Sequence, residues 1–388
     1  MYSLRLSLEA AVVIFPIVAF LITIPYILWH YYKYGSVLLL RAMILYSFIL
    51  YLLCAYFLVI LPLPPIEEVA VLTTQRVQLI PFQFVNDLQM YTLFSSWTPE
   101  IMTSSFFNSV FLQVFFNIIM FVPLGIYLRY YYRRNIFECI FFSFIVSVFF
   151  ELTQLSGLYG IYPRPYRLFD VDDLILNTSG GLAGFVIEPV FTWILPSKEK
   201  LNELSYRKGQ KITTYRRIMA MFVDWLVIYA FLCIADFTIH AVNIEEVFFL
   251  SSIKGFIVYI SIVIIVFMII PYLSGGNTIG KKLVKIKVVG WKNQKAKLSQ
   301  YFVRYGILYG LLLPALLYAY RIYQYLPEGT SGIGYFVGMA MILGMILISV
   351  IFIIRFFITC ITHGKQFLYE SASLTKQMSD IVIPLDAD

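Results

Sequence analysis

Nine stretches of the chain are apolar for about the length that a helix needs to cross a bilayer. A helical span needs about 20 mainly apolar residues, because each residue adds about 1.5 Å to a hydrocarbon path of about 30 Å. We therefore predict membrane helices near 9–29, 41–62, 110–130, 136–157, 174–195, 218–239, 250–272, 302–320 and 334–357. The pattern indicates an all-α, polytopic membrane protein.

One segment shows the alternation of a β-strand instead of the long apolar run of a membrane helix. Residues 283–289 read LVKIKVV, in which apolar and polar positions partly alternate, and Gly290 and a polar Lys-Asn-Gln run follow. Alternation ahead of a glycine-containing turn is typical of a hairpin. We predict a small cytoplasmic β-hairpin within 273–301, between two membrane helices.

Composition agrees with the membrane assignment. The chain is 60% hydrophobic, 18% aromatic and only 13% charged. The first apolar run is too long for a typical signal peptide and lacks a small-residue cleavage site, so we interpret it as a retained anchor. The four cysteines lie in or beside apolar runs without paired spacing, which argues against disulfides and zinc. We expect neither a metal nor another cofactor.

The longest polar stretch between neighbouring spans, residues 196–217, predicts a division of the chain. We assign a membrane module to 1–196, a cytoplasmic linker to 197–215, a second membrane module to 216–375 and a tail to 376–388. The two modules show no internal repeat.

Lysine and arginine predict the orientation, since cytoplasmic loops retain these residues. Most of them fall in alternate loops, which places the N-terminus outside and the C-terminus in the cytoplasm. The net charge of +7 fits contact with anionic lipid head groups and requires no nucleic acid. Residue usage rich in Ile, Phe, Tyr and Lys suggests a bacterial plasma membrane. The sequence does not fix the oligomeric state.

Polar side chains gather around the predicted outward loop between the fourth and fifth spans. Because such groups are costly at membrane depth, they are candidate functional residues. We select as ligand-binding candidates Glu151, Gln154, Arg164, Arg167, Asp170, Asp172, Asp173 and Asn177. No metal-ligand set or activated nucleophile accompanies them, so no catalytic residue is assigned.

Helical spacing arranges this cluster. Glu151 and Gln154 are three residues apart and share a face, and Asp170, Asp173 and Asn177 form a stripe on the following helix. Small residues farther along that helix would let a neighbouring helix approach closely, namely Gly180, Gly181 and Gly184.

Structural alternatives exist for several of these residues. Asp170 is also a suitable helix N-cap, and Asn177 is also suited to an inter-helix hydrogen bond. Arg164 and Arg167 are also suited to lipid head groups. Glu151 lies inside an apolar run and needs a partner, for which we expect Arg164 or Arg167.

Four motifs follow one another in the first module: Leu79-Ile-Pro-Phe82, Asn117-Ile-Ile-Met-Phe-Val-Pro-Leu-Gly125, Glu151-Leu-Thr-Gln154 and Arg167-Leu-Phe-Asp170-Val-Asp-Asp-Leu-Ile-Leu-Asn177-Thr-Ser-Gly-Gly181. On these motifs, the module resembles the VanZ-like family over about residues 40–195. It implies a multi-span protein whose founding member lowers sensitivity to the glycopeptide teicoplanin. A cell-wall precursor or a glycopeptide is then the expected ligand.

The second module contains the motifs Arg217-Ile-Met-Ala-Met-Phe-Val-Asp224 and Gly276-Asn-Thr-Ile-Gly-Lys-Lys282, followed by Arg304. On these residues, it resembles the RDD family over about 213–375. The family usually has His-Asp near the end, whereas here Gly364 follows His363. The resemblance implies cation/proton exchange, with Arg217, Asp224 and Arg304 as transport candidates. Alternatively, Asp224 forms a structural ion pair with Arg217 or Arg304.

Three function classes follow. The first is an envelope protein that binds a surface or lipid-linked ligand. The second is a cation/proton transporter centred on Asp224, and the third is a membrane-embedded hydrolase or transferase acting on an envelope lipid precursor. Nucleotide binding is rejected, because the run around Gly276 lacks the Lys-Ser/Thr end of a phosphate-binding loop.

Overall fold

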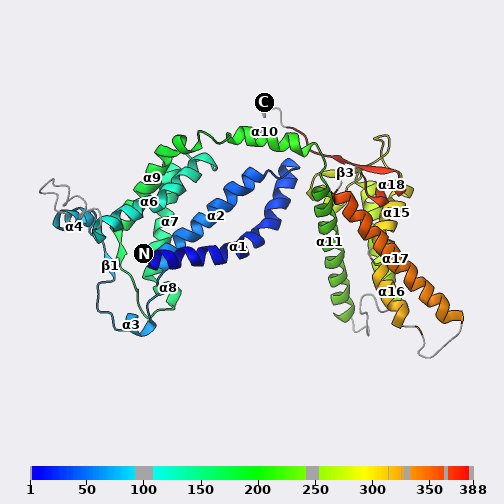
Figure 1. Ribbon diagram of the computed structural model, residues 1–388, viewed down its shortest axis with the longest axis horizontal. Coiled ribbons are helices and arrows are strands. Elements are labelled where there is room, and N and C mark those ends of the chain that lie inside the picture. Colours follow the sequence, from blue (N-terminus) through cyan, green and yellow to red (C-terminus); the bar gives the residue numbers. More distant parts are fainter. Residues whose placement is uncertain are drawn as a thin grey trace. The chain divides into compact units, whose positions relative to one another are not determined.

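The computed structural model describes residues 2–91, 108–241, 253–312, 314–324, 326, 333–361 and 366–383. The chain divides into two compact units. Unit 1 contains residues 1–23 and 38–201, and unit 2 contains 24–37 and 202–388. The first helix, α1 (Tyr2–Tyr34), is therefore shared between them. Figure 1 labels the elements along the chain.

Unit 1 is helical apart from one pair of very short strands. Its elements after α1 are α2 (Leu39–Ile60), α3 (Ile66–Ala70), β1 (Val77–Gln78), α4 (Gln83–Tyr91), α6 (Ser109–Tyr130), α7 (Ile136–Leu155), α8 (Gly157–Gly160), β2 (Phe169–Asp170) and α9 (Val171–Thr192). The predicted linker contains a further helix, α10 (Lys198–Gly209). Strand β1 pairs in parallel with β2, so that Gln78 lies opposite Asp170.

Polar caps define where the long helices of unit 1 begin. The side chain of Asn108 accepts a hydrogen bond from the backbone of Val110 at the start of α6. Asn135 and Glu138 form a capping box at the start of α7. Such caps satisfy backbone N–H groups that have no partner within the helix. Between α6 and α7, Phe121 and Phe150 pack against each other in an apolar core.

Unit 2 combines helices with one antiparallel strand pair. Its elements are α11 (Thr214–Ala241), α12 (Ile253–Val263), the π-helix η1 (Ile264–Ile269), α13 (Ile270–Leu273), α14 (Ile279–Leu283), β3 (Ile286–Gly290), α15 (Leu298–Tyr305), the π-helix η2 (Gly306–Leu312), α16 (Ala315–Gln324), α17 (Ile333–Ile361), α18 (Leu368–Ala372) and β4 (Thr375–Ser379). Its largest core cluster includes Phe267, Tyr305 and Tyr309.

Seven of the described helices are long and apolar enough to cross a membrane. They correspond to seven of the nine predicted spans, and the helical, polytopic fold class is confirmed. The other two predictions, 250–272 and 302–320, fall instead on successive α-helical and π-helical pieces. Proline removes a backbone donor and obstructs helix continuation, and Pro271 and Pro314 lie at or beside these interruptions.

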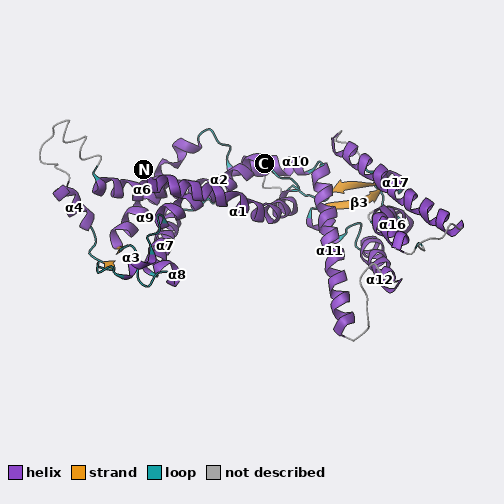
Figure 2. Ribbon diagram, turned by 60° about the horizontal axis from the view of Figure 1, so that its bottom comes forward, coloured by secondary structure: helices purple, strands orange, loops and turns teal. Residues whose placement is uncertain are grey.

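The predicted hairpin is present only in part, as the strands in Figure 2 show. Strand β3 forms where expected, but its five-residue partner is β4, near the C-terminus. Within the described residues, its local return is limited to one bridge between Val289 and Lys295. The chain enters α15 at Leu298, so too few residues remain for a returning strand. The predicted tail 376–388 thus begins inside the sheet.

A buried arginine holds this sheet to the start of α11. The side chain of Arg216 is fully buried and donates to the carbonyl oxygens of Gly209, Val284 and Lys285 at 2.5–2.7 Å. Planar guanidinium groups have several donors and can satisfy several carbonyls at once. The single side chain therefore connects the end of α10 with the segment that enters β3.

Candidate functional sites

Helices α6 and α9 of unit 1 approach closely at glycines. A Cβ atom on Gly180 would lie 2.1 Å from the carbonyl oxygen of Ile118, and one on Gly184 would lie 2.0 Å from that of Val122. A Cβ on Gly181 would meet the hydroxyl of Ser143 on α7. The predicted close helix approach is confirmed, and it brings the polar faces of three helices together.

A layer of polar side chains lies between α6, α7 and α9. Asp173 of α9 accepts a hydrogen bond from the amide of Asn117 on α6. One turn later, Asn177 donates to the hydroxyl of Ser147 on α7 at 2.9 Å. Glu151, also on α7, accepts a hydrogen bond from the backbone N–H of Asp170, one turn before Asp173. The fold therefore brings three of the predicted binding residues into one site.

The partner of Glu151 differs from the prediction. Its side chain is 3% exposed and accepts from the backbone N–H of Asp170 at 3.1 Å. Among the described residues, neither Arg164 nor Arg167 forms an ion pair with it, although Arg167 contributes a favourable charge. Both donate to carbonyl oxygens in the 61–74 segment, at 2.5 and 3.4 Å. The reason is local: backbone acceptors lie within reach of both arginines in the loop, and α9 begins beside Glu151.

The layer contains buried polar atoms that are not satisfied within it. The Oδ1 atom of Asn177 and the hydroxyl of Ser143 are buried without a hydrogen-bond partner among the described residues. Two carboxylates belong to the same layer: Asp173 lies one turn before Asn177 on α9, and Glu151 lies one turn after Ser147 on α7. Unpaired buried polar atoms are unusual and often mark a place for water, an ion or a ligand. A group rich in hydrogen-bond donors would satisfy this arrangement.

Asp170 and Asp172 serve the scaffold around the layer. Asp170 caps α9, as the structural alternative proposed, and accepts from the backbone N–H of Asp172 at 2.9 Å. Burial raises the pKa of Asp170 above its ordinary value. Asp172 accepts from the backbone N–H groups of Phe82 and Phe84 at 2.6 and 2.8 Å, and so fixes the start of α4. Both residues thus have structural partners.

Gln154 also makes a structural contact, since its amide donates to the carbonyl of Val59 at 2.9 Å. It ties the end of α7 to α2. Of the eight predicted residues, Glu151, Asp173 and Asn177 therefore lie in the polar layer, and the others surround or support it.

In unit 2, Asp224 is fully buried and saturated with donors. Its carboxylate accepts from the Thr278 hydroxyl and the Gly280 backbone at 2.8 Å, from the Lys281 ammonium at 3.2 Å and from the Tyr309 hydroxyl at 3.3 Å. Burial by itself lowers the pKa of Lys281, but the neighbouring Tyr305 and Asp224 outweigh it and raise that pKa. Asp224 therefore sits in a closed, charge-balanced site.

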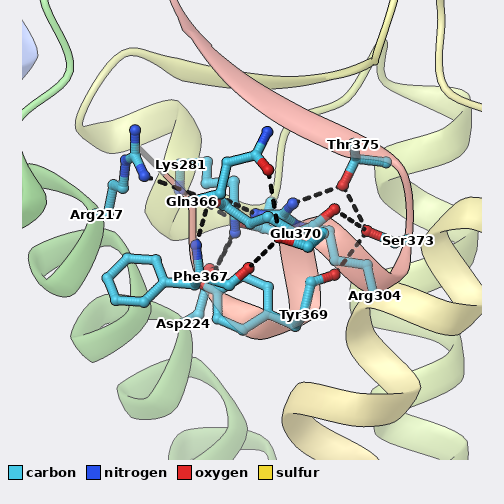
Figure 3. A network of polar contacts seen from close by, with 12 residues as sticks. Arg217, Asp224, Lys281, Arg304, Gln366, Phe367, Tyr369, Glu370, Ser373 and Thr375 are labelled. Carbon is cyan, nitrogen blue, oxygen red and sulfur yellow. Dashed lines mark hydrogen bonds and ion pairs between the residues drawn. The ribbon is translucent and has the colours of Figure 1, made fainter. Parts of the chain in front are cut away.

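The predicted pairing of Asp224 with Arg217 or Arg304 is wrong. Figure 3 shows both guanidiniums directed instead at Glu370 on α18, at 3.3 and 3.1 Å. Arg304 also donates to the Thr375 hydroxyl at 2.7 Å. Glu370 is 153 residues from Arg217 in the sequence, so helical spacing could not identify this pair.

Comparison with known families agrees with these two units. Residues 48–192 match the model of the VanZ/LLP1 family, and residues 213–370 match that of the RDD family. The chain joins a VanZ-like module to an RDD domain. Comparisons with curated proteins and with solved structures found no match. Together with its apolar helices, the two families make this a multi-pass membrane protein of the cell envelope.

Sequence reasoning missed three residues of the RDD domain: Thr278, Lys281 and Glu370. The run Gly276–Lys282 was recognised, but only as a family motif. Glu370 had a usable signal, because Glu328 is the only other acid between residues 251 and 379. An isolated acid among many lysines and arginines is a strong candidate for a buried counter-ion. His363 and Gly364 lie outside the described residues.

The described residues contain no group of three or more His, Cys, Asp or Glu side chains that could hold a metal ion. The acids of the VanZ-like layer are accompanied by amides and hydroxyls instead. Such a layer is suited to hydrogen bonding with an organic ligand.

Proposed function

We propose that the VanZ-like module binds a donor-rich group of an envelope ligand in the polar layer of α6, α7 and α9, and thereby lowers sensitivity to teicoplanin. Suitable groups are an ammonium, an amide N–H or a sugar hydroxyl. A surface or lipid-linked cell-wall precursor has this chemistry, as does a glycopeptide.

One observation carries the proposal. Glu151 and Asp173 lie on adjacent helices, where Glu151 accepts from the backbone of Asp170 and Asp173 accepts from Asn117, and no arginine or lysine among the described residues forms an ion pair with either carboxylate. In the same layer, the Oδ1 atom of Asn177 has no hydrogen-bond partner in the part of the chain that the structure describes. Carboxylates within apolar, membrane-spanning helices cost free energy, and such residues commonly have a functional role. The match to the VanZ/LLP1 family supports a role in the envelope.

The test is survival of a teicoplanin-sensitive Gram-positive host that expresses wild type, Asp173→Asn or Glu151→Gln at equal membrane levels. Loss of one charged hydrogen bond weakens binding by about tenfold, so we expect protection by wild type and its loss in Asp173→Asn. Glu68→Gln is the matched control, since Glu68 is an exposed acid of the same unit. Protection that survives Asp173→Asn would overturn the proposed site.

The Glu151→Gln variant separates binding from catalysis. If protection requires Asp173 but not Glu151, a binding role fits better than paired acid–base chemistry. If both are required, the hydrolase or transferase alternative gains support. Incubation of the purified protein with a lipid-linked precursor, followed by product analysis, then decides between the two.

A second function, cation/proton exchange, rests on the RDD domain. The buried Asp224 beside Lys281 and Tyr309 is the observation in its favour. The Lys281 ammonium contacts the Oδ2 atom of Asp224, so a transported cation would have to displace it. If Asp224 is the exchanging acid, vesicle flux driven by a pH gradient should be lost in Asp224→Asn and kept in Asp380→Asn. Equal flux in wild type and Asp224→Asn would refute exchange at this residue.

A further inference from the structure

A pocket of the VanZ-like module lies at the opposite ends of α6 and α9 from the polar layer. Its volume is about 410 Å³, and its lining includes Arg129, Arg133, Arg134 and Lys198. We propose that this pocket binds a phosphate-bearing anion, such as the head group of an anionic lipid or a soluble phosphate. The predicted orientation would place it at the cytoplasmic leaflet.

The cations come from separate pieces of structure that converge on one space. Arg129 ends α6, Arg133 and Arg134 lie in the turn before α7, and Lys198 begins α10. The lining also includes the aromatic ring of Phe185 from α9. Arginine binds phosphate in a bidentate manner, and basic pockets at helix ends suit lipid head groups. A loop that merely retains positive charge needs no such convergence of cations on one pocket.

The carboxylates that accompany these arginines hold them weakly. Arg133 pairs with Glu199 and Arg134 with Glu138, and all four side chains are 41–69% exposed. Ion pairs this exposed contribute little to stability and are screened by salt. Each guanidinium has five N–H donors, so these contacts leave donors for an anion.

Arg129 is held more firmly. It stacks over the Phe185 ring at 4.5 Å and donates to the Phe185 carbonyl at 2.7 Å. Its Nε lies 3.2 Å from Glu188, whose other carboxylate oxygen accepts from the Thr192 hydroxyl at 2.6 Å. Glu188 is thus the one acid in the lining, and it both orients Arg129 and opposes an incoming anion.

The turn before α7 holds Arg133 in an unfavourable backbone conformation. Arg133 has φ of +57°, in the left-handed region that favours glycine. This conformation costs an arginine about 1–2 kcal/mol relative to right-handed backbone. Glycine would avoid this free-energy cost. We therefore infer that the Arg133 side chain has a role besides its place in the turn after α6. Its guanidinium lines the pocket.

The experiment uses the full chain, delipidated in a nonionic detergent. Binding of tail-labelled phosphatidylglycerol is measured by fluorescence anisotropy, with tail-labelled phosphatidylcholine as the zwitterionic comparison and inorganic phosphate as a competitor. The variants are Arg133→Gln/Arg134→Gln and Glu188→Gln. Arg207→Gln/Lys208→Gln is the control, because it removes two positive charges from α10 outside the pocket.

We expect phosphatidylglycerol to bind more tightly than phosphatidylcholine. The Arg133/Arg134 variant should weaken binding about tenfold, whereas the control should leave it nearly unchanged. Glu188→Gln should strengthen binding, a gain that misfolding does not produce. Poor competition by phosphate assigns the site to a lipid head group, and effective competition assigns it to a soluble phosphate compound.

Equal binding of the two lipids would overturn the proposal. So would equal losses in the pocket variant and the control, since the effect would then be one of net charge alone. Weaker binding in Glu188→Gln would also contradict it. The site is independent of Glu151 and Asp173, so teicoplanin survival and lipid binding fail or succeed separately.

Discussion

Replacement of Glu370 by glutamine should strongly destabilise the RDD domain. Glu370 is 1% exposed, and its two oxygens face Arg304, which is fully buried, and Arg217. The amide keeps the shape and can still accept one hydrogen bond, but the counter-charge is gone. Removing one partner of a buried ion pair costs about 3–5 kcal/mol, because the remaining charge is left uncompensated. Two guanidiniums share Glu370, so we expect the upper part of that range.

The matched control is Asp380→Asn. Asp380 pairs with Lys287 at 3.1 Å in the same domain, but the two side chains are 42% and 37% exposed. Exposed pairs contribute about 0–1 kcal/mol. Both variants remove one negative charge, so the difference between their free energies of unfolding reports the effect of burying the ion pair.

The assay is unfolding in mixed micelles with increasing sodium dodecyl sulfate, followed by circular dichroism. Glu370→Gln should unfold at clearly lower denaturant than Asp380→Asn. Adding Arg304→Met to Glu370→Gln should recover part of the loss, because the stranded charge is removed. If Glu370→Gln and Asp380→Asn differ by less than about 1 kcal/mol, the buried network does not hold the domain together.

Two further predictions concern the VanZ-like module and use the same principle of paired variants. Gly180→Ala should destabilise it by about 1–3 kcal/mol, because the new methyl group would meet the backbone of Ile118. The control Gly344→Ala lies in the other unit, faces open space and should be tolerated. Thermal melts of the detergent-solubilised protein compare the two variants. Asp172→Ala leaves two N–H groups of the α4 segment without their acceptor, so hydrogen exchange over residues 79–91 should rise, and the exposed control Glu68→Ala should not change it. Equal melts, or unchanged exchange in Asp172→Ala, would contradict these assignments.

The candidate sites were predictable only in part. Spacing along α9 placed Asp173 and Asn177 on one stripe and identified glycines for close packing, since helical period and residue size are local properties. It did not reveal Asn117 or Ser147, whose positions depend on how α6 and α7 dock. The sequence also led us to expect Arg164 or Arg167 as the partner of Glu151, although both arginines donate to carbonyls of the loop.

The sequence by itself determined the class of protein, seven of its long helices and the two family modules. These follow from hydropathy over about 20 residues and from ordered motifs, which need no knowledge of tertiary contacts. Only the tertiary structure decided that β3 pairs with β4, that Asp224 faces Lys281, and that Glu370 joins Arg217 to Arg304. Buried backbone and charged groups take whichever partner packing brings within hydrogen-bonding distance, and that partner can lie more than a hundred residues away.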